Sequence, residues 1–319
     1  MALSSSPPKL LFLVTGAAGF IGRALCRGLV ERGHRVIGLS RSPAEPIPGV
    51  ELRPIGEIAP QTPWSQHLTS VDTVIHLATR AHRSVSGMTA RREAESAAVL
   101  GHAAAAEGVR RLLLMSSIRA MGEVTRPGAP FRADDPPLPR EVYGVAKLTI
   151  ERAVLSAARE TGLDLVILRP PLVYGPAVKA NFRALMRLVA SGLPLPFSRI
   201  DNRRSLIFLD NLVEVTALAA THPAAAGHVL LVRDPVDLST QELISHLAAA
   251  LGRPVRLFAL PEAGLAVLRS LPAVGPLAAR LTLWLQVDDA ATRRLLDWTP
   301  PVSLETGLAA TARDFHDRR

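Results

Sequence analysis

The chain of 319 residues is 48% hydrophobic and 20% charged, a composition typical of a globular protein and not of a disordered one. The chain is too long for a single small domain, and its length fits either one large α/β domain with an appended lobe or two domains. Cys26 is the one cysteine, which excludes an intrachain disulfide framework.

The formal net charge of +9 comes mostly from arginines spread along the chain. Aromatic residues make up 4%, too few for the stacking surfaces of single-strand binders, so we expect no nucleic-acid partner and favour a phosphate-rich ligand. Met1–Pro8 lacks the basic start of a signal peptide, and prolines and charged residues interrupt the apolar stretch 257–285. We therefore expect a cytoplasmic protein without a membrane span.

The first half of the chain alternates short apolar runs with longer helical patterns. We expect strands at residues 10–14, 35–39, 51–55, 72–78, 111–116 and 163–168. We expect helices at residues 19–32, 89–107 and 142–161, the first followed by Gly33 and the last by Gly162. Continuous apolar strands that alternate with helices predict an α/β fold with a doubly wound parallel sheet and right-handed crossovers.

The pattern loosens beyond Pro171. We expect helices at residues 181–191 and 210–221, strands at 204–209 and 229–232, and a further helix that begins after Ser239. Glu242 follows Ser239 by three residues, which is the spacing of a capping box. We therefore divide the chain into residues 1–170 and a smaller C-terminal lobe, residues 171–319, which should pack as one unit because no low-complexity linker separates them.

Glycines stand at every third position directly after the first strand, at Gly16, Gly19 and Gly22. The first permits a tight turn, the second lets the backbone approach a phosphate, and the third allows close contact between helix and strand. Because the amino end of the next helix offers N–H donors and a positive field, the segment predicts a dinucleotide pyrophosphate site. A glycine-rich turn without a ligand is the alternative.

The end of the second strand bears on which dinucleotide binds. Enzymes that prefer NAD usually carry Asp or Glu there for the ribose hydroxyls. This chain has Ser40 and Arg41 instead, which suit a 2′-phosphate, so the sequence favours NADP(H), with NAD(H) as the alternative. Arg41 as a solvated loop residue is the simpler interpretation.

Tyr143 and Lys147 lie four residues apart in an expected helix and therefore share a face. A nearby ammonium stabilises a phenolate and lowers its pKa, which fits a tyrosine for general acid–base chemistry. Ser116 and Ser117 follow the preceding strand at its carboxyl end, where such sheets bind ligands. A serine hydroxyl there can hold the reacting oxygen beside Tyr143. Chance spacing of structural residues is the alternative.

With these motifs the chain resembles the extended short-chain dehydrogenase/reductase family of NAD(P)-dependent sugar-nucleotide epimerases, dehydratases and ketoreductases. The resemblance runs from residue 10 to residue 315, and its carriers are residues 15–22, 76–78, 115–117, 143–147 and 169–176. It implies a Rossmann-like doubly wound parallel sheet with a C-terminal substrate-binding lobe. It also implies a homodimer formed through the helices that begin near Thr89 and Val142.

The resemblance implies a set of site residues as well. Catalysis would fall to Ser117, Tyr143 and Lys147, without a metal. The residues expected along the cofactor are Gly16, Gly19, Phe20, Ile21, Gly22, Ser40, Arg41, Glu57, Ile58, Leu77, Ala78, Tyr143, Lys147 and Pro170. Family members often carry an Asn in the helix before the serine strand; residues 84–110 contain none, and the replacement is expected from Glu93, Glu95, Ser96 or water.

Two segments of the second half, residues 178–182 and 202–212, resemble those that grip a nucleoside diphosphate. By this resemblance Asn181 and Arg204 bind the diphosphate, since a guanidinium donates two parallel charge-assisted bonds, while Ser117 contacts the sugar. Arg203 is a weaker candidate, because a solvated hairpin explains it equally well. Asp210 is expected to cap the following helix.

The branch that the chain resembles contains reductases of UDP-4-keto-6-deoxy-N-acetylhexosamines, which serve bacterial surface-polysaccharide assembly, and similar UDP-sugar 4-epimerases. Because a net reductase consumes NADPH, Ser40 and Arg41 favour the reductase. A UDP-sugar 4-epimerase with tightly bound NAD is the first alternative. A non-catalytic NADP-binding regulatory protein is the second, and the intact set of Ser117, Tyr143 and Lys147 argues against it.

Overall fold

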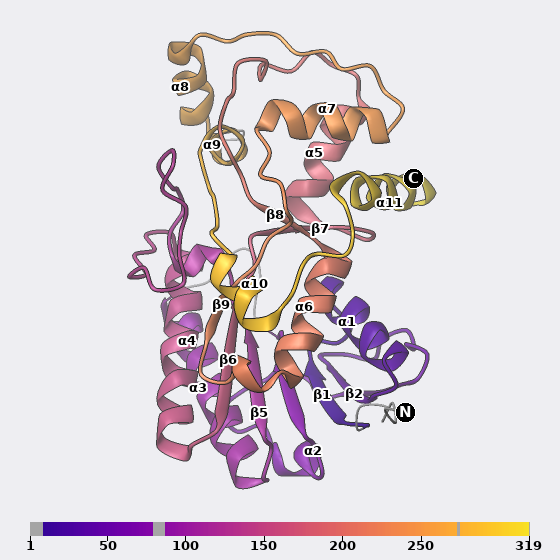
Figure 1. Cartoon of the computed structure of the whole chain (residues 1–319), viewed down its shortest axis with the longest axis vertical. Coiled ribbons are helices and arrows are strands. Elements are labelled where there is room, and N and C mark those ends of the chain that lie inside the picture. Colours follow the sequence, from indigo (N-terminus) through magenta and orange to yellow (C-terminus); the bar gives the residue numbers. More distant parts are fainter. Residues whose placement is uncertain (1–8, 79–86, 273–274, 319) are drawn as a thin grey trace, which may run out of the picture. The chain divides into compact units, whose positions relative to one another are not determined.

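Seven strands form the main sheet of the computed structural model, which describes residues 9–78, 87–272 and 275–318 (Figure 1). Their order is β3-β2-β1-β4-β5-β6-β9, and the pairs from β3 to β6 are parallel. The strands are β1 (Leu11–Thr15), β2 (Arg35–Ser40), β3 (Val50–Pro54), β4 (Thr73–His76), β5 (Arg111–Met115), β6 (Asp164–Arg169) and β9 (Val229–Leu231). The order reverses between β1 and β4, so the predicted Rossmann-like doubly wound sheet is confirmed.

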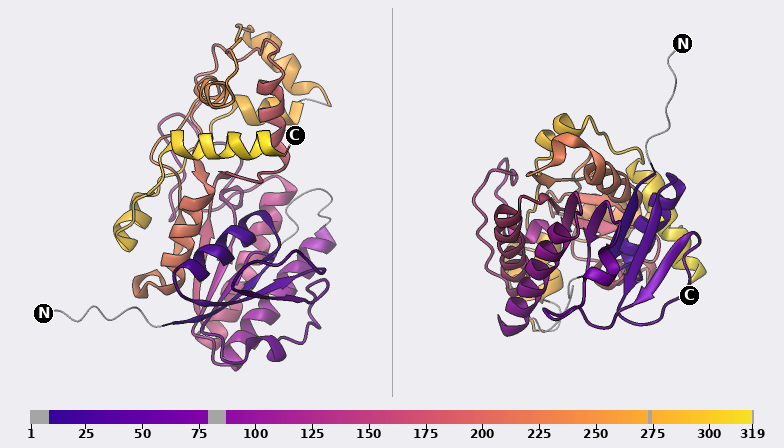
Figure 2. Two further views of the ribbon diagram at one scale, coloured as in Figure 1. Left: turned by 90° about the vertical axis from the view of Figure 1, so that its right-hand side faces the viewer. Right: turned by 90° about the horizontal axis from the view of Figure 1, so that it is seen from below.

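Helices cover both faces of this sheet (Figures 1 and 2). They are α1 (Phe20–Glu31), α2 (Ser65–Leu68), α3 (Gly87–Ala106), α4 (Val142–Thr161) and α6 (Leu209–Thr221), with short 3₁₀ turns η1 (Ile118–Ala120) and η2 (Pro223–Ala225). Leu100 of α3 and Val154 of α4 join Leu13 and Val74 in one buried apolar cluster. On the other face α1 meets α6 so closely that a Cβ on Gly28 would lie 2.5 Å from Val213 Cγ1.

The chain divides into two compact units that exchange segments. Unit 1 comprises the described residues of Met1–Ala120, Pro137–Arg169 and Val213–Leu230, and unit 2 comprises those of Met121–Pro136, Pro170–Leu212 and Leu231–Arg319. Unit 1 gains Val213–Leu230 because α6 packs on α1. Unit 2 gains Met121–Pro136 because this segment pairs with the strand-like stretch near Gln286, whose carbonyl accepts the Phe131 N–H at 3.0 Å. The cofactor and substrate roles of residues 1–170 and 171–319 stay predictions.

Unit 2 is built from short elements around an aromatic core. Strands β7 (Leu172–Tyr174) and β8 (Leu206–Phe208) pair in parallel. The helices are α5 (Ala180–Ala190), α7 (Thr240–Ala250), α8 (Glu262–Ser270), α9 (Gly275–Thr282), α10 (Ala290–Leu296) and α11 (Leu304–Asp317). Tyr174 lies 5.5 Å, between ring centroids, from both Phe182 and Phe208. The predicted capping box at the start of α7 is confirmed.

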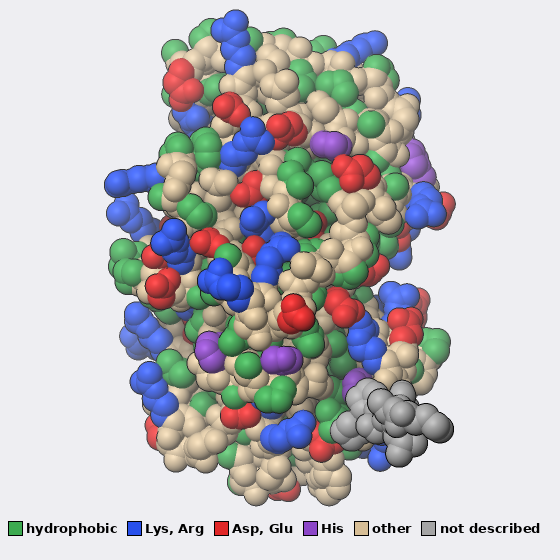
Figure 3. All heavy atoms as spheres, viewed as in Figure 1, with side chains coloured by type: hydrophobic (Ala, Val, Ile, Leu, Met, Phe, Trp, Pro, Cys, Tyr) green, Lys and Arg blue, Asp and Glu red, His purple; other side chains and the backbone are tan. Residues whose placement is uncertain are grey.

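No helix in the described part of the chain is both long enough and apolar enough to cross a membrane. The Met1–Pro8 segment, for which the sequence predicts no signal peptide, lies outside the described residues. Figure 3 shows basic side chains scattered among acidic and apolar ones over the face in view. This distribution matches the spread of arginines along the sequence.

Candidate active site

The glycine turn after β1 has a backbone that other residues would strain. Gly16 has φ +71°, in the left-handed region that favours glycine, and a Cβ there would lie 3.2 Å from the Ala78 nitrogen. A Cβ on Gly22 would lie 2.2 Å from the Gly16 oxygen, so α1 can approach the turn only with glycine at this position. The roles that the sequence predicts for Gly16 in a tight turn and Gly22 in close packing match these distances.

The amino end of α1 suits an anion. Gly19 occupies the N-cap position, no side chain of the described residues caps it by a hydrogen bond, and its first turn holds no acidic residue. The first N–H groups of the helix, which include those of Phe20 and Ile21, have no partner within the helix and point outward with the positive end of the dipole. This turn therefore fits the pyrophosphate of a dinucleotide, which is the group that the sequence predicts here.

A small polar group joins β1 to the end of β4. The Thr15 hydroxyl accepts the N–H groups of Leu77 and Ala78 at 3.2 and 3.1 Å and lies 2.9 Å from His76 Nδ1. Since two donors already point at the Thr15 oxygen, its own proton goes to Nδ1. His76 is buried, and burial, helped by the charge of Lys147, lowers its pKa to about 4. The imidazole is therefore neutral at pH 7.

The structure brings Ser117, Tyr143 and Lys147 together within unit 1. Ser117 follows β5, and its hydroxyl is hydrogen-bonded to that of Tyr143 near the start of α4. Lys147 Nζ lies 5.9 Å from the centre of the Tyr143 ring and donates to the Met115 carbonyl at 3.3 Å. Gly144 permits this approach, because a Cβ there would lie 2.3 Å from the Arg119 oxygen.

Burial dominates the electrostatics of this trio. Lys147 is 6% exposed, and burial lowers its pKa to about 8, against the opposing charges of Glu93 and then Glu151. Burial likewise raises the pKa of Tyr143, more than its bond to Ser117 and the charge of Arg119 lower it. The expectation of a lowered phenol pKa is therefore wrong for the protein alone, since desolvation outweighs the charge of Arg119 and the bond to Ser117.

Glu93, Glu95 and Ser96 are the residues expected in place of the family's Asn, and of these Glu93 influences the pKa values of Tyr143 and Lys147. The Ser96 hydroxyl donates to the Arg92 carbonyl at 2.7 Å, within its own helix, and Glu95 is exposed. Glu93 is half-buried, and its charge raises the pKa of both Tyr143 and Lys147.

Sequence reasoning missed a buried ion pair beside the trio. Glu151, one turn after Lys147, accepts two bonds from the Arg169 guanidinium, the one from Nε at 2.9 Å. Both side chains are buried, at 3% and 5% exposure. The signal available was the i, i+4 spacing of Lys147 and Glu151 together with an arginine at a strand end.

The end of β2 carries no carboxylate. Ser40 is buried there and donates its hydroxyl to the Ser42 carbonyl at 2.8 Å, while Arg41 is exposed. Glu57 and Ile58, expected near an adenine, follow β3; Glu57 is exposed and lines a hollow with Ile55. These residues lie at the carboxyl edge of the sheet, where the glycine turn also lies.

Asn181 and Arg204, the residues expected to bind the diphosphate, belong to unit 2, as does Pro170, whereas Ser117, expected to contact the sugar, belongs to unit 1. Asn181 lies in the first turn of α5 and is half-buried. Arg204 donates from Nη1 to the Leu283 carbonyl at 2.8 Å. Arg203 donates to the Glu242 carboxylate at 2.8 Å.

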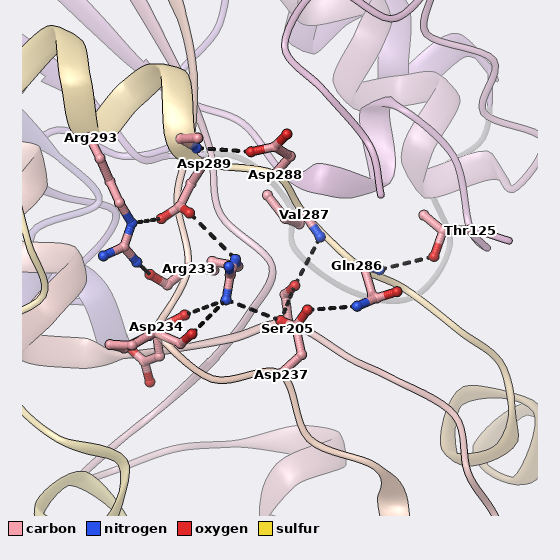
Figure 4. Close-up of polar contacts among 12 residues, drawn as sticks. Thr125, Ser205, Arg233, Asp234, Asp237, Gln286, Val287, Asp288, Asp289 and Arg293 are labelled. Atoms are coloured by element: carbon pink, nitrogen blue, oxygen red, sulfur yellow. Dashed lines mark hydrogen bonds and ion pairs between the residues drawn. The ribbon is translucent and has the colours of Figure 1, made fainter. Parts of the chain in front are cut away.

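A polar network holds the segment that follows Arg204 (Figure 4). The Ser205 hydroxyl donates to Asp237 at 2.7 Å and accepts the Val287 N–H at 2.9 Å. Arg233 lies between Asp237 and Asp289, at 3.5 and 3.4 Å. This network fixes the backbone next to Arg204. The local sequence pattern does not predict the network.

Comparison with known proteins shows the family of the chain. The family described as NAD dependent epimerase/dehydratase family matches residues 12–232. A UDP-glucose 4-epimerase of Vibrio cholerae is 36% identical over 97% of this chain and 96% of its own. A 2-alkyl-3-oxoalkanoate reductase of Stenotrophomonas maltophilia is 31% identical over 93% of this chain and 96% of its own.

Solved structures give the same fold. The protein MoeE5, solved in complex with UDP-glucose and NAD, superposes with a TM-score of 0.76 at 26% identity. The superposition covers 96% of this chain and 99% of that one. The similarity therefore extends through both units and is not limited to the glycine turn.

Proposed function

Because the chain belongs to the NAD dependent epimerase/dehydratase family, the extended short-chain dehydrogenases/reductases, we propose that it is a UDP-sugar 4-epimerase working with NAD. The observation that carries the proposal is the trio of Ser117, Tyr143 and Lys147, assembled in the same unit as a dinucleotide turn. The relatives support this reading better than the reductase that the sequence favoured.

The residues of the trio divide the work. Tyr143 takes the proton of the C4 hydroxyl and later returns it, while Ser117 holds the reacting oxygen beside the phenol. Lys147, buried and held by the Met115 carbonyl, supplies a fixed positive charge that stabilises the phenolate form of Tyr143, which takes the proton and is regenerated when the proton is returned. When bound along Gly16–Gly22, Leu77 and Ala78, the nicotinamide supplies a reversible hydride acceptor. Burial of the trio keeps water from the reacting oxygen.

Residues of unit 2 would bind the nucleotide part of the substrate. We propose that Asn181 and Arg204 bind the diphosphate, with Pro170 near the cofactor. A diphosphate needs fixed, charge-assisted donors, and the network around Ser205 holds the backbone next to Arg204.

The test is a mass balance. The purified protein is incubated with UDP-glucose and UDP-N-acetylglucosamine without added cofactor, and products are identified by NMR. We expect interconversion of C4 epimers with no net change in nicotinamide absorbance. Stoichiometric NADPH oxidation dependent on a UDP-4-keto-6-deoxy-N-acetylhexosamine would instead support the reductase, and absence of any turnover would support the regulatory protein.

One observation keeps the NADPH-dependent reductase as the second candidate. No acid stands at the end of β2, and Arg41 is exposed there, free of the strand ladder and able to meet a 2′-phosphate. If it does, Arg41→Ala should weaken NADPH binding by about 1–3 kcal/mol more than NADH binding. Equal effects on both dinucleotides, measured by calorimetry, favour NAD and the epimerase.

We also propose a homodimer through α3 and α4. Large apolar side chains are exposed on these helices: Met88 at 80%, Val142 at 60% and Val145 at 44%. Light scattering of the wild type and of Val145→Glu tests this, with the variant expected to be monomeric. A cytoplasmic location and a place in surface-polysaccharide assembly are proposed on the nature of the substrate.

A further inference from the structure

The charged groups that face Lys147 come from several elements of unit 1. Among the described residues, Glu93 of α3 and Glu151 of α4, which is paired with Arg169 of β6, act on Lys147. Arg119 of η1, which is paired with Glu141, acts on Tyr143, and His76 of β4 is neutral. Glu151 is bound on both oxygens by Arg169, and Arg119 forms an ion pair with Glu141. The charge of Glu151 also opposes the burial of Lys147, but less than that of Glu93 does, since Glu151 is paired with Arg169.

The packing of α3 on α4 places Glu93 beside the catalytic turn. The helices run side by side in the same direction (Figure 1): a Cβ on Gly101 would lie 3.3 Å from Ala157 Cβ, and His102 Nε2 lies 3.5 Å from Glu160. Going back eight residues along each helix from Gly101 and Ala157 leads to Glu93 and to the turn between Lys147 and Glu151.

Glu93 also lies on the correct side of its helix. Residues one turn before and after it, Ala90 and Ala97, are buried, at 8% and 1% exposure, while Glu93 itself is half-buried. Glu93 therefore lies at the edge of the buried face of α3. A carboxylate here is partly desolvated, so its charge reaches further than it would from an exposed position.

We propose that Glu93 is a positioning residue of the site: its carboxylate, held on α3 at the level of Lys147, keeps that lysine an ammonium at neutral pH. The proposal deepens the proposed epimerase function, and only its effect on turnover rests on that function. Among the charges that oppose the burial of Lys147, that of Glu93 comes first. The same charge raises the pKa of Tyr143, so Glu93 acts on both members of the pair in one direction.

The direct test is the titration of Lys147 in the full-length protein, followed by NMR of ¹³Cε-labelled lysine. The lysines are Lys9, Lys147 and Lys179, and the signal that titrates near pH 8 should be that of Lys147, assigned with Lys147→Arg. In Glu93→Gln we expect that midpoint to fall by about half a unit to one unit, because a nearby negative charge is lost. Glu93→Asp, which keeps the charge, should shift it less.

The matched control is Glu95→Gln, which removes the same charge from an exposed position on the same helix. It should leave the Lys147 midpoint where it is. An unchanged midpoint in Glu93→Gln, with native circular dichroism, would overturn the proposal, as would an equal shift in Glu95→Gln. This titration needs no substrate, so it stands or fails independently of the epimerase assignment.

The kinetic counterpart uses the pH profile of kcat/KM. Because the charge of Glu93 raises the pKa of both Tyr143 and Lys147, removing it should move both limbs of the profile to lower pH. A merely structural role for Glu93 predicts a lower maximum at an unmoved pH, which contradicts the proposal. If no UDP-sugar is turned over while the Lys147 midpoint still shifts, the proposed function fails and the role of Glu93 stands.

Discussion

The two tyrosines of the chain lie one in each unit and have opposite surroundings. Tyr143 of unit 1 is half-buried and bonded to a neutral serine hydroxyl, beside a lysine whose pKa is lowered to about 8. Tyr174 of unit 2 is fully buried between Phe182 and Phe208 and donates to the Asp234 carboxylate at 2.8 Å. The first can release its proton when charge nearby changes, whereas the second is held in the protonated form.

The two units also differ in how they use buried charged side chains. In unit 1 Lys147 is buried and donates to the Met115 carbonyl at 3.3 Å, and the burial of its charge costs folding free energy. In unit 2 Asp289 is buried between Arg233 and Arg293, at 3.4 and 2.8 Å. The buried charge of Lys147 therefore serves the site, that of Asp289 serves the architecture, and variants can separate the two.

The largest effect expected is on turnover. Tyr143→Phe keeps the ring and removes the proton that the mechanism transfers, so we expect turnover to fall by at least about 100-fold, the scale of general acid–base catalysis. Dinucleotide binding and thermal unfolding should stay near wild type. The measurement is a UDP-sugar assay beside calorimetric binding of NAD; near-normal turnover would remove Tyr143 from the mechanism.

Removing the shared acid of unit 2 should have the next largest effect. Asp289→Ala leaves two guanidiniums, each about a quarter exposed, without their buried partner. We expect the free energy of unfolding to fall by about 3 kcal/mol, measured by urea denaturation. Asp288→Ala, at the neighbouring half-exposed position, is the control and should cost clearly less. Equal losses would mean that the network of Figure 4 adds no stability of its own.

A third prediction concerns pH. Burial lowers the pKa of His76 from 6.5 to about 4, so the unfolded chain binds a proton at higher pH than the folded one. This contribution to stability is complete above pH 6.5 and is lost as pH falls toward 4, up to about 3 kcal/mol. His76→Asn should lose less stability than wild type across that window. The exposed His228→Asn should behave as wild type, and parallel curves for all three proteins would contradict the prediction.

How far the sequence predicts the structure also differs between the units. In unit 1 the strands β1, β2, β5 and β6 contain the continuous apolar runs that buried parallel strands require, whereas the edge strand β3 carries Glu51 and Arg53. Helix α4 has the predicted bounds. Ser117, Tyr143 and Lys147 could be found because strand ends of a doubly wound sheet meet at one edge. The Glu151–Arg169 pair and the effect of burial on Tyr143 could not, since both depend on how elements distant in sequence pack.

In unit 2 the sequence predicts less. The strands have three residues each, and the expected strand at 204–209 shortens to β8 because Arg204 and Ser205 bond instead to Leu238 and Leu285. Strand β7 and helices α8 to α11 were not predicted. Strand β7 and helices α8 to α10 have at most nine residues, and for α11 the N-cap signal at Ser303 was missed. The capping box at Ser239 was found because its signal lies entirely within four residues.

The smallest effect expected returns to the second tyrosine. Tyr174→Phe keeps the ring between Phe182 and Phe208 and removes one donor to Asp234, which still accepts from the Phe208 N–H at 3.1 Å and from Asn211 at 2.7 Å. Since the carboxylate keeps these donors, we expect a loss of about 1–2 kcal/mol in the free energy of unfolding.

Turnover of Tyr174→Phe, measured where the variant is fully folded, should stay within about twofold of wild type, because its ring packing is kept and no proton of Tyr174 takes part in the mechanism. Tyr143→Phe is the matched variant, with the reverse pattern of lost activity and kept stability. A large loss of turnover in Tyr174→Phe without a loss of stability would show that the chemistry also depends on the unit 2 core, and the contrast between the tyrosines would then fail.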